Sequence, residues 1–278
     1  MGDPWGSTGR FVRALVWAML GLAVVAQPAP LRIGVAPHTS ARVILELYQP
    51  LRASLEKSLG RPVEILTAPD FTEFARRGLA QEYDLAITTG HQARLFQVDA
   101  GYLPLLTYKA DFKAVAMVAL KGRIRTAQDL RGTVTIGLSP SSLVTLWGQH
   151  WLVAQHLGDV PVRYVSAADS VAQLLLAGEG SAGFVSLANF QKLSPEVQSQ
   201  LRILAESPAM AGRVYVLNAR NAFLKARLEG ALWSFAGSPE GRAYFEANKL
   251  EGYRHLKPTE LKAMDPYAAE VRLTLKGK

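Results

Sequence analysis

The sequence predicts an α/β fold of two lobes, each built on a mainly parallel sheet flanked by helices, with a ligand cleft between the lobes. Three observations lead to this prediction. Short apolar segments alternate with helical patterns, an order typical of parallel sheets covered on both faces. The alternation restarts near residue 114 without a long linker. The length of 278 residues is enough for two such units.

The first unit opens with residues 31–36, an apolar run that predicts a buried strand. Apolar residues then recur every four positions over 43–59, which predicts an amphipathic helix that ends at Gly60. Asp70 is placed to N-cap the helix that follows. The other strands predicted in this unit are 63–67 and 84–88.

The second unit repeats this order. Ser141 or Ser142 is placed to cap a helix that runs to residue 157. Ser238-Pro239-Glu240 begins a later helix, with proline at the first helical position and an acid in the first turn. The strands predicted from here onward are 114–120, 133–138, 162–165, 182–185, 201–205 and 213–217.

Two lobes without a long linker imply that the chain crosses between them more than once. We expect the crossings near 108–113 and 203–207. Lobe 1 would then comprise 27–110 and 206–278, and lobe 2 would comprise 111–205. Ligands of open α/β sheets bind beyond the carboxyl ends of strands, so the cleft is expected there.

The first 26 residues read as an export signal. Arg10 and Arg13 precede a short apolar run, 14–25, and Ala26 ends a small-residue cleavage pattern. A bilayer-spanning helix needs about 20 apolar residues, so this run fits a cleaved signal better than the alternative, an uncleaved membrane anchor. Cleavage after Ala26 lowers the net charge from +8 to +7 and predicts a soluble periplasmic protein.

Composition narrows the function further. The chain has no cysteine, which excludes disulfides, thiol catalysis, cysteine metal sites and a lipoprotein anchor. Its basic residues are scattered rather than gathered in a stripe, so the positive charge favours a small anion over nucleic acid. With 49% hydrophobic residues, the chain has the composition of a folded protein.

The ordered set of local motifs resembles that of periplasmic substrate-binding proteins of ABC transporters with the type 2 fold, in particular the phosphonate, phosphite and phosphate family. The resemblance runs through most of the mature chain, although each motif alone is common. The motifs are Leu31-Arg32-Ile33-Gly34-Val35, Ala68-Pro69-Asp70-Phe71, Tyr83-Asp84-Leu85-Ala86, Thr88-Thr89-Gly90-His91, Asp129-Leu130-Arg131-Gly132, Ser207-Pro208 and Ser238-Pro239-Glu240-Gly241.

The family's hydroxyl-rich turn, roughly Ser-Thr-Ser-Gly, corresponds here to Ser141-Ser142-Leu143-Val144. Two hydroxyls match, whereas Leu143 and Val144 replace the third hydroxyl and the glycine. The resemblance also implies that Asp169 matches an acidic position that meets a ligand amine in some members. Because of the departures, an organic ligand in contact with Leu143 and Val144 stays an alternative to a phosphonate.

Several residues at strand ends are candidates for ligand contact. Ser141 and Ser142 stand at a helix start, where free N–H groups and a partial positive charge suit an oxyanion. Phe71 contacts the ligand or is a core aromatic, and His91 donates to an anion or caps its helix. The remaining candidates on strand-end loops and at the first crossing are His38, Thr39, Thr88, Thr89, Gly90 and Phe112.

The leading hypothesis is a non-enzymatic binding protein, without cofactor or metal, that closes its lobes on a small oxyanion and delivers it to an ABC permease. His150 and His156 lie six residues apart, which does not place two metal ligands on one helical face. Two alternatives stay open: a sensor that signals to the periplasmic domain of a kinase, and an enzyme on the same fold. We expect a monomer.

Overall fold

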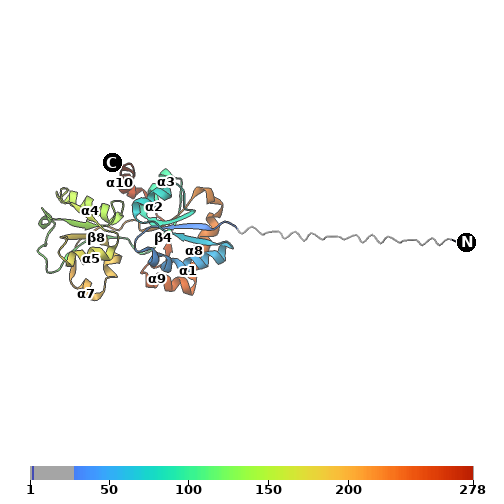
Figure 1. Cartoon of the computed structure of the whole chain (residues 1–278), viewed down its shortest axis with the longest axis horizontal. Helices are drawn as coiled ribbons and strands as arrows, with labels where there is room; N and C mark the ends of the chain where they lie inside the picture. The colour runs from blue at the N-terminus through green and yellow to red at the C-terminus, as the bar shows by residue number, and fades with distance from the viewer. Residues whose placement is uncertain (1, 3–27, 278) are drawn as a thin grey trace.

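A computed structural model of the chain describes residue 2 and residues 28–277. In this part of the chain two β-sheets lie side by side, each with helices on both faces (Figure 1). One sheet has six strands in the order β11-β4-β10-β3-β1-β2, and the other has five in the order β7-β6-β8-β5-β9. We call the six-stranded sheet with α1–α3 and α8–α10 lobe 1, and the five-stranded sheet with α4–α7 lobe 2.

Most of the predicted strands and helices are present, with ends shifted by a few residues. The strands are β1 (Leu31–Val35), β2 (Val63–Leu66), β3 (Leu85–Thr89), β4 (Leu103–Tyr108), β5 (Ala114–Ala119), β6 (Thr135–Gly137), β7 (Val162–Tyr164), β8 (Ala182–Ser186), β9 (Leu201–Glu206), β10 (Arg213–Leu217) and β11 (Tyr253–Arg254). The α-helices are α1 (Ala41–Leu59), α2 (Phe71–Leu79), α3 (Gly90–Asp99), α4 (Leu143–Ala154), α5 (Ala168–Leu176), α6 (Leu187–Gln191), α7 (Pro195–Gln198), α8 (Lys225–Gly237), α9 (Pro239–Ala247) and α10 (Asp265–Leu275).

The sheets of the described chain are mainly parallel, as the sequence predicts, with four of six strands in lobe 1 and four of five in lobe 2 pointing the same way. The strands β2-β1-β3 and β7-β6-β8 run parallel, as βαβ units require. By contrast β10 is antiparallel to both β3 and β4, and β5 is antiparallel to both β8 and β9. The antiparallel strands include those that enter or leave a lobe, so their direction follows from where the chain crosses.

The chain passes between the lobes twice, at 109–113 and at 207–212. Ile203 and Ala205 still pair with β5, so the second passage begins only after Glu206. The strand β4, which precedes the first passage, was missed in the sequence. The two passages touch, since Phe112 and Met210 form an antiparallel bridge.

Two apolar cores hold lobe 1 on either side of its sheet. Under α1, α8 and α9, the helix α1 buries Leu51, Leu55 and Leu59, as its periodicity predicts, and Gly60 ends it with a φ of 63°. The core under α2 and α3 continues into lobe 2, where it includes Phe184 of β8. The lobes are therefore packed against each other on the α2–α3 side.

The C-terminal helix α10 reaches both lobes and lies above their junction in Figure 1. It packs on α2 and α3 of lobe 1 and also contacts α4 of lobe 2. At the contact with α4, Glu270 accepts a hydrogen bond from His150 Nε2, and the ring of Tyr267 stacks on His150 with centroids 4.8 Å apart. The end of the chain thus connects the two lobes.

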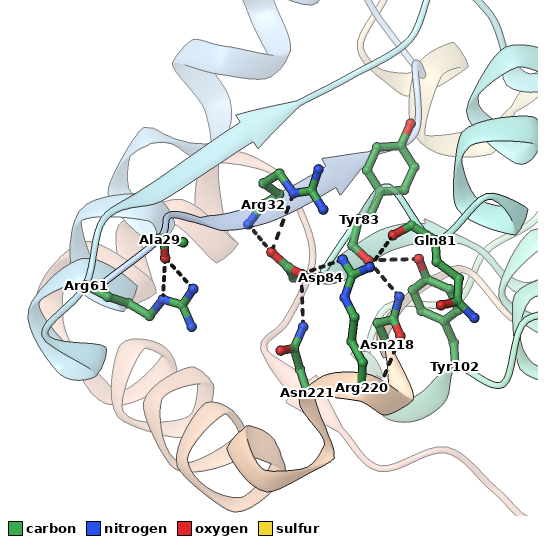
Figure 2. Close-up of polar contacts among 10 residues, drawn as sticks. All are labelled: Ala29, Arg32, Arg61, Gln81, Tyr83, Asp84, Tyr102, Asn218, Arg220 and Asn221. Atoms are coloured by element: carbon green, nitrogen blue, oxygen red, sulfur yellow. Dashed lines mark hydrogen bonds and ion pairs between the residues drawn. The ribbon is translucent and has the colours of Figure 1, made fainter. Parts of the chain in front are cut away.

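A buried carboxylate stabilises the edge of lobe 1 that is formed by the N-terminal ends of β1 and β3 (Figure 2). Asp84, 8% exposed, accepts hydrogen bonds from the Arg32 backbone N–H at 2.9 Å, the Arg220 guanidinium at 2.6 Å and the Asn221 amide at 3.0 Å. Burial alone would raise the pKa of Asp84, but these donors outweigh it and hold the pKa below its usual value. The ionised carboxylate joins β1, the start of β3 and the segment after β10.

Two expectations from the sequence fall in the N-terminal region. The predicted signal peptide and its cleavage after Ala26 lie in residues 3–27, outside the described part of the chain. Of the helices in residues 28–277, none combines the length and the apolar character that crossing a bilayer demands.

Candidate ligand-binding site

A cavity of about 110 Å³ lies where the two lobes meet. Drug-sized ligands occupy pockets of roughly 300–1,000 Å³, so this space suits a small molecule. The first passage lines it through Asp111 and Phe112, lobe 1 contributes His38 and Thr89, and the polar residues from lobe 2 are Ser142, Ser186, Asn189 and Lys192. The cavity lies at the ends of strands from both sheets, as the sequence predicts.

The start of α4 presents free donors to this cavity. Ser142 is the N-cap of α4, yet its side chain caps no backbone N–H. Among the described residues, the N–H groups of Leu143, Val144 and Thr145 have no backbone acceptor, which is expected in the first turn of a helix. Leu143 and Val144 line the cavity. An anion in the cavity would satisfy these groups.

The start of α2, in contrast, is satisfied within the protein. Asp70 accepts from the N–H groups of Thr72 and Glu73 at the start of α2. Gly90 donates its N–H to the Ala211 carbonyl at 3.2 Å. A ligand therefore gains more from the start of α4 than from the start of α2.

Positive side chains from both lobes also line the cavity. Arg213, at the start of β10, is half-buried, whereas Lys192 of lobe 2 and Lys249 of lobe 1 are exposed. In residues 28–277, the Arg213 guanidinium makes no hydrogen bond or ion pair. Partial desolvation of the Lys192 amine and the charges of Arg213 and Lys249 together lower the pKa of Lys192. The cations that line the cavity therefore form no ion pair with any carboxylate of the described chain.

His38 places an acceptor at the same site. Its Nδ1 donates to the Ala36 carbonyl at 2.9 Å, so in the neutral ring Nε2 carries a lone pair. That Nε2 is buried and has no hydrogen-bond partner in the described residues. Burial, and then the charge of Arg213, lower the pKa of His38 well below its usual value. The ring is therefore neutral at physiological pH.

His91 joins the two lobes instead of lining the cavity. Its Nε2 donates to the Ser141 carbonyl of lobe 2 at 2.9 Å, so its Nδ1 accepts from the Thr89 hydroxyl at 3.0 Å. The Ser141 hydroxyl is also used between the lobes, in a hydrogen bond of 2.9 Å with Thr72. We call His91, Ser141 and Thr72 the interlobe latch. Neither His91 nor Ser141 lines the cavity.

Five of the residues predicted from the sequence line the cavity: His38, Phe71, Thr89, Phe112 and Ser142. Their contact with a ligand stays a proposal. Phe71 is only 6% exposed and packs in the core, as expected of a core aromatic. The Thr89 hydroxyl donates its hydrogen bond to His91, so the Thr89 oxygen is left to act as an acceptor.

The other predicted residues have different surroundings. Thr88 is fully buried and donates to Gln92 at 3.0 Å. A Cβ at Gly90 would lie 2.4 Å from that of Ala211, so this glycine permits the close approach of the second passage. Thr39 is half-buried beside the N-cap of α1, and Asp169 is exposed in the first turn of α5; neither lines the cavity.

The interlobe latch makes stability depend on pH. Burial lowers the pKa of His91 to about 4, whereas an unfolded histidine titrates near ~6.5. Between these values the unfolded chain binds a proton that the folded chain does not, so stability falls as pH falls. We expect His91 to account for about 2 kcal/mol of loss between pH 7 and pH 5.

Urea unfolding at pH 7 and pH 5 measures this loss. His91→Gln, whose amide can still donate to Ser141, should show a smaller loss than the unsubstituted protein. His255→Gln, at an exposed position, is the control and should keep the full loss. His38, whose pKa is also lowered, contributes to the loss of stability at low pH, and because both variants keep His38 this contribution is the same in each. An unchanged pH dependence in His91→Gln would contradict the assignment.

Comparison with protein families gives one match over most of the chain. Residues 33–261 match the family described as ABC transporter, phosphonate, periplasmic substrate-binding protein. The chain belongs to this family. Proteins of this phosphonate-binding family are binding components of transporters and not enzymes. A comparison with curated protein sequences gives no significant match.

Solved structures with the same fold include members of the phosphonate-binding family. PhnD1 from Prochlorococcus marinus in complex with methylphosphonate superposes with a TM-score of 0.77 at 14% identity, over 88% of this chain and 98% of that chain. XAC2383 from Xanthomonas citri bound to ATP gives 0.74 at 20% identity, over 90% and 99%. A component of the ABC phosphonate transporter of Pseudomonas aeruginosa gives 0.72 at 14% identity, over 90% and 94%. These likenesses establish the two-lobed fold.

Sequence reasoning missed the cationic side chains that line this cavity. Arg213 begins a strand, Lys192 follows the short helix α6 and Lys249 follows α9, and no local motif marks them. Their spacing in the chain gives no sign that they share a cavity. The one available signal was the position of Arg213 five residues after Pro208, where the chain returns to lobe 1.

Proposed function

We propose that the protein captures a small oxyanion of the phosphonate, phosphite or phosphate type between its lobes and delivers it to an ABC importer. The observation that carries this proposal is the cavity itself, where the uncapped start of α4 and the unpaired Arg213 lie together. Both are donors that suit an oxyanion, and neither has a partner within residues 28–277. Membership of the phosphonate-binding family supports the same function.

The cationic side chains of the cavity come from both lobes, and this couples anion binding to closure of the lobes. Lys192 belongs to lobe 2, and Arg213 and Lys249 belong to lobe 1, so bringing the lobes together brings like charges together. A bound anion replaces this repulsion with attraction from both sides. The interlobe latch then adds neutral hydrogen bonds between the lobes. Ligand binding and closure therefore favour each other.

A thermal-shift titration of the purified protein tests the proposal. Methylphosphonate, phosphite and phosphate are compared with sodium chloride at equal ionic strength. A ligand at 100 times its dissociation constant stabilises the folded state by about 2.7 kcal/mol, which raises the midpoint of a chain this long by roughly 5–10 °C. At least one oxyanion should produce this shift. No shift with any of the three would refute oxyanion binding.

A further inference from the structure

The charges that line the cavity do not cancel. Three cationic side chains, Lys192, Arg213 and Lys249, face one carboxylate, Asp111, which leaves a charge of +2. The start of α4 adds about half a positive charge. His38 contributes none, because burial keeps its ring neutral.

The rest of the described chain does not neutralise this excess. Arg213 and Lys249 make no side-chain hydrogen bond or ion pair in residues 28–277, and Lys192 reaches only the neutral Asn248 oxygen, at 3.5 Å. The pKa of Lys113 is raised mainly by Glu206 and that of Arg254 mainly by Glu260, and Asp111 adds a smaller contribution to both, so its charge also acts outside the cavity. The negative charge that balances the positive cavity lining must therefore come from the ligand.

The volume and the lining of the cavity also limit the size and the polarity of the ligand. Its volume is about 110 Å³, and apolar side chains such as Phe71, Leu143 and Val144 form part of its lining. A large anion with several polar groups does not suit this space. A compact head with two negative charges and a small apolar substituent does.

We infer that the site selects a compact dianion, with Arg213 as the residue that distinguishes two negative charges from one. This inference rests on the proposed function and adds the charge of the ligand to it. Arg213 is the most buried of the three cations, so its interaction with an anion is the least screened by water. The exposed Lys192 and Lys249 attract anions of either charge.

Three ligands of similar size test the inference at pH 8 by calorimetry on the purified protein. Methylphosphonate is largely a dianion at this pH, sulfate is a dianion, and methanesulfonate is a monoanion. We expect methylphosphonate and sulfate each to bind at least tenfold more tightly than methanesulfonate. Including sulfate separates charge from recognition of phosphorus.

Substitutions assign the preference to Arg213. Arg213→Gln should reduce the preference for methylphosphonate over methanesulfonate at least threefold, whereas Arg213→Lys should retain most of it. Arg123→Gln is the matched control, since Arg123 is exposed and makes no side-chain hydrogen bond or ion pair in residues 28–277; its preference should not change.

The outcomes separate this inference from the proposed function. Equal affinity for methanesulfonate and methylphosphonate would overturn the inference and leave oxyanion capture intact. Tight methylphosphonate binding with weak sulfate binding would also overturn it, because charge would then not be the criterion. A preference unchanged in Arg213→Gln would overturn the role of Arg213. No binding of any of the three would refute oxyanion capture itself.

Discussion

Val144→Asp is expected to abolish oxyanion binding while the protein stays folded. Val144 is 5% exposed, lines the cavity and lies in the first turn of α4. A carboxylate there interacts favourably with the helix start and with the cations opposite, so it takes the place of the ligand. Two like charges at about 4 Å repel by ~4 kcal/mol at an effective dielectric constant of 20. Affinity for methylphosphonate should therefore fall more than 100-fold.

Val144→Asn is the matched control for this substitution. It has nearly the same size and polarity but no charge, and we expect it to weaken binding by less than tenfold. Calorimetry gives the two affinities, and thermal unfolding without ligand shows that both variants fold. Equal affinities for Val144→Asp and Val144→Asn would contradict the placement of the anion at the start of α4.

Asp84→Ala is expected to cause the largest loss of stability. The change leaves the Arg32 N–H, Arg220 and Asn221 without their shared acceptor at the edge of lobe 1 (Figure 2). Removing one partner of a buried ion pair costs roughly 3–5 kcal/mol. Because Arg220 is 40% exposed and recovers water, we expect about 3 kcal/mol.

Urea unfolding at pH 7 measures this cost, with Glu179→Ala as the control. Glu179 pairs with Arg163, and both side chains are 50% exposed. Exposed pairs contribute about 0–1 kcal/mol, so the control should unfold nearly like the unsubstituted protein. Losses of equal size in the two variants would show that the Asp84 cluster does not hold the edge of lobe 1.

Local patterns predicted most of the fold because strands, caps and helix faces are encoded over short distances. The prediction of Asp70 as an N-cap is confirmed by its two backbone hydrogen bonds, and Ser238-Pro239 starts α9 as expected. The direction of β10 was not predictable in this way. It depends on the route by which the chain re-enters lobe 1, which no local pattern records.

The site was predictable in part, for the same reason. A turn between a strand and a helix is visible in the sequence, so Ser142 and Thr89 were found and line the cavity. Ser141 and His91 have equally suitable chemistry, but their donors and acceptors are used between the lobes. That distinction requires knowing how the lobes meet, as does the convergence of Lys192, Arg213 and Lys249.

Because α10 contacts both lobes outside the cavity, we expect it to affect the affinity for ligands but not the preference among them. This helix is packed on α2 and α3 but touches α4 through Tyr267 and Glu270, so its contacts exist fully only when the lobes are together. The apparent affinity of such a protein is its intrinsic affinity scaled by the fraction of molecules in the competent form. Changes along α10 would therefore multiply the affinity for every ligand by one common factor, and the order of preference would stay with the residues of the cavity.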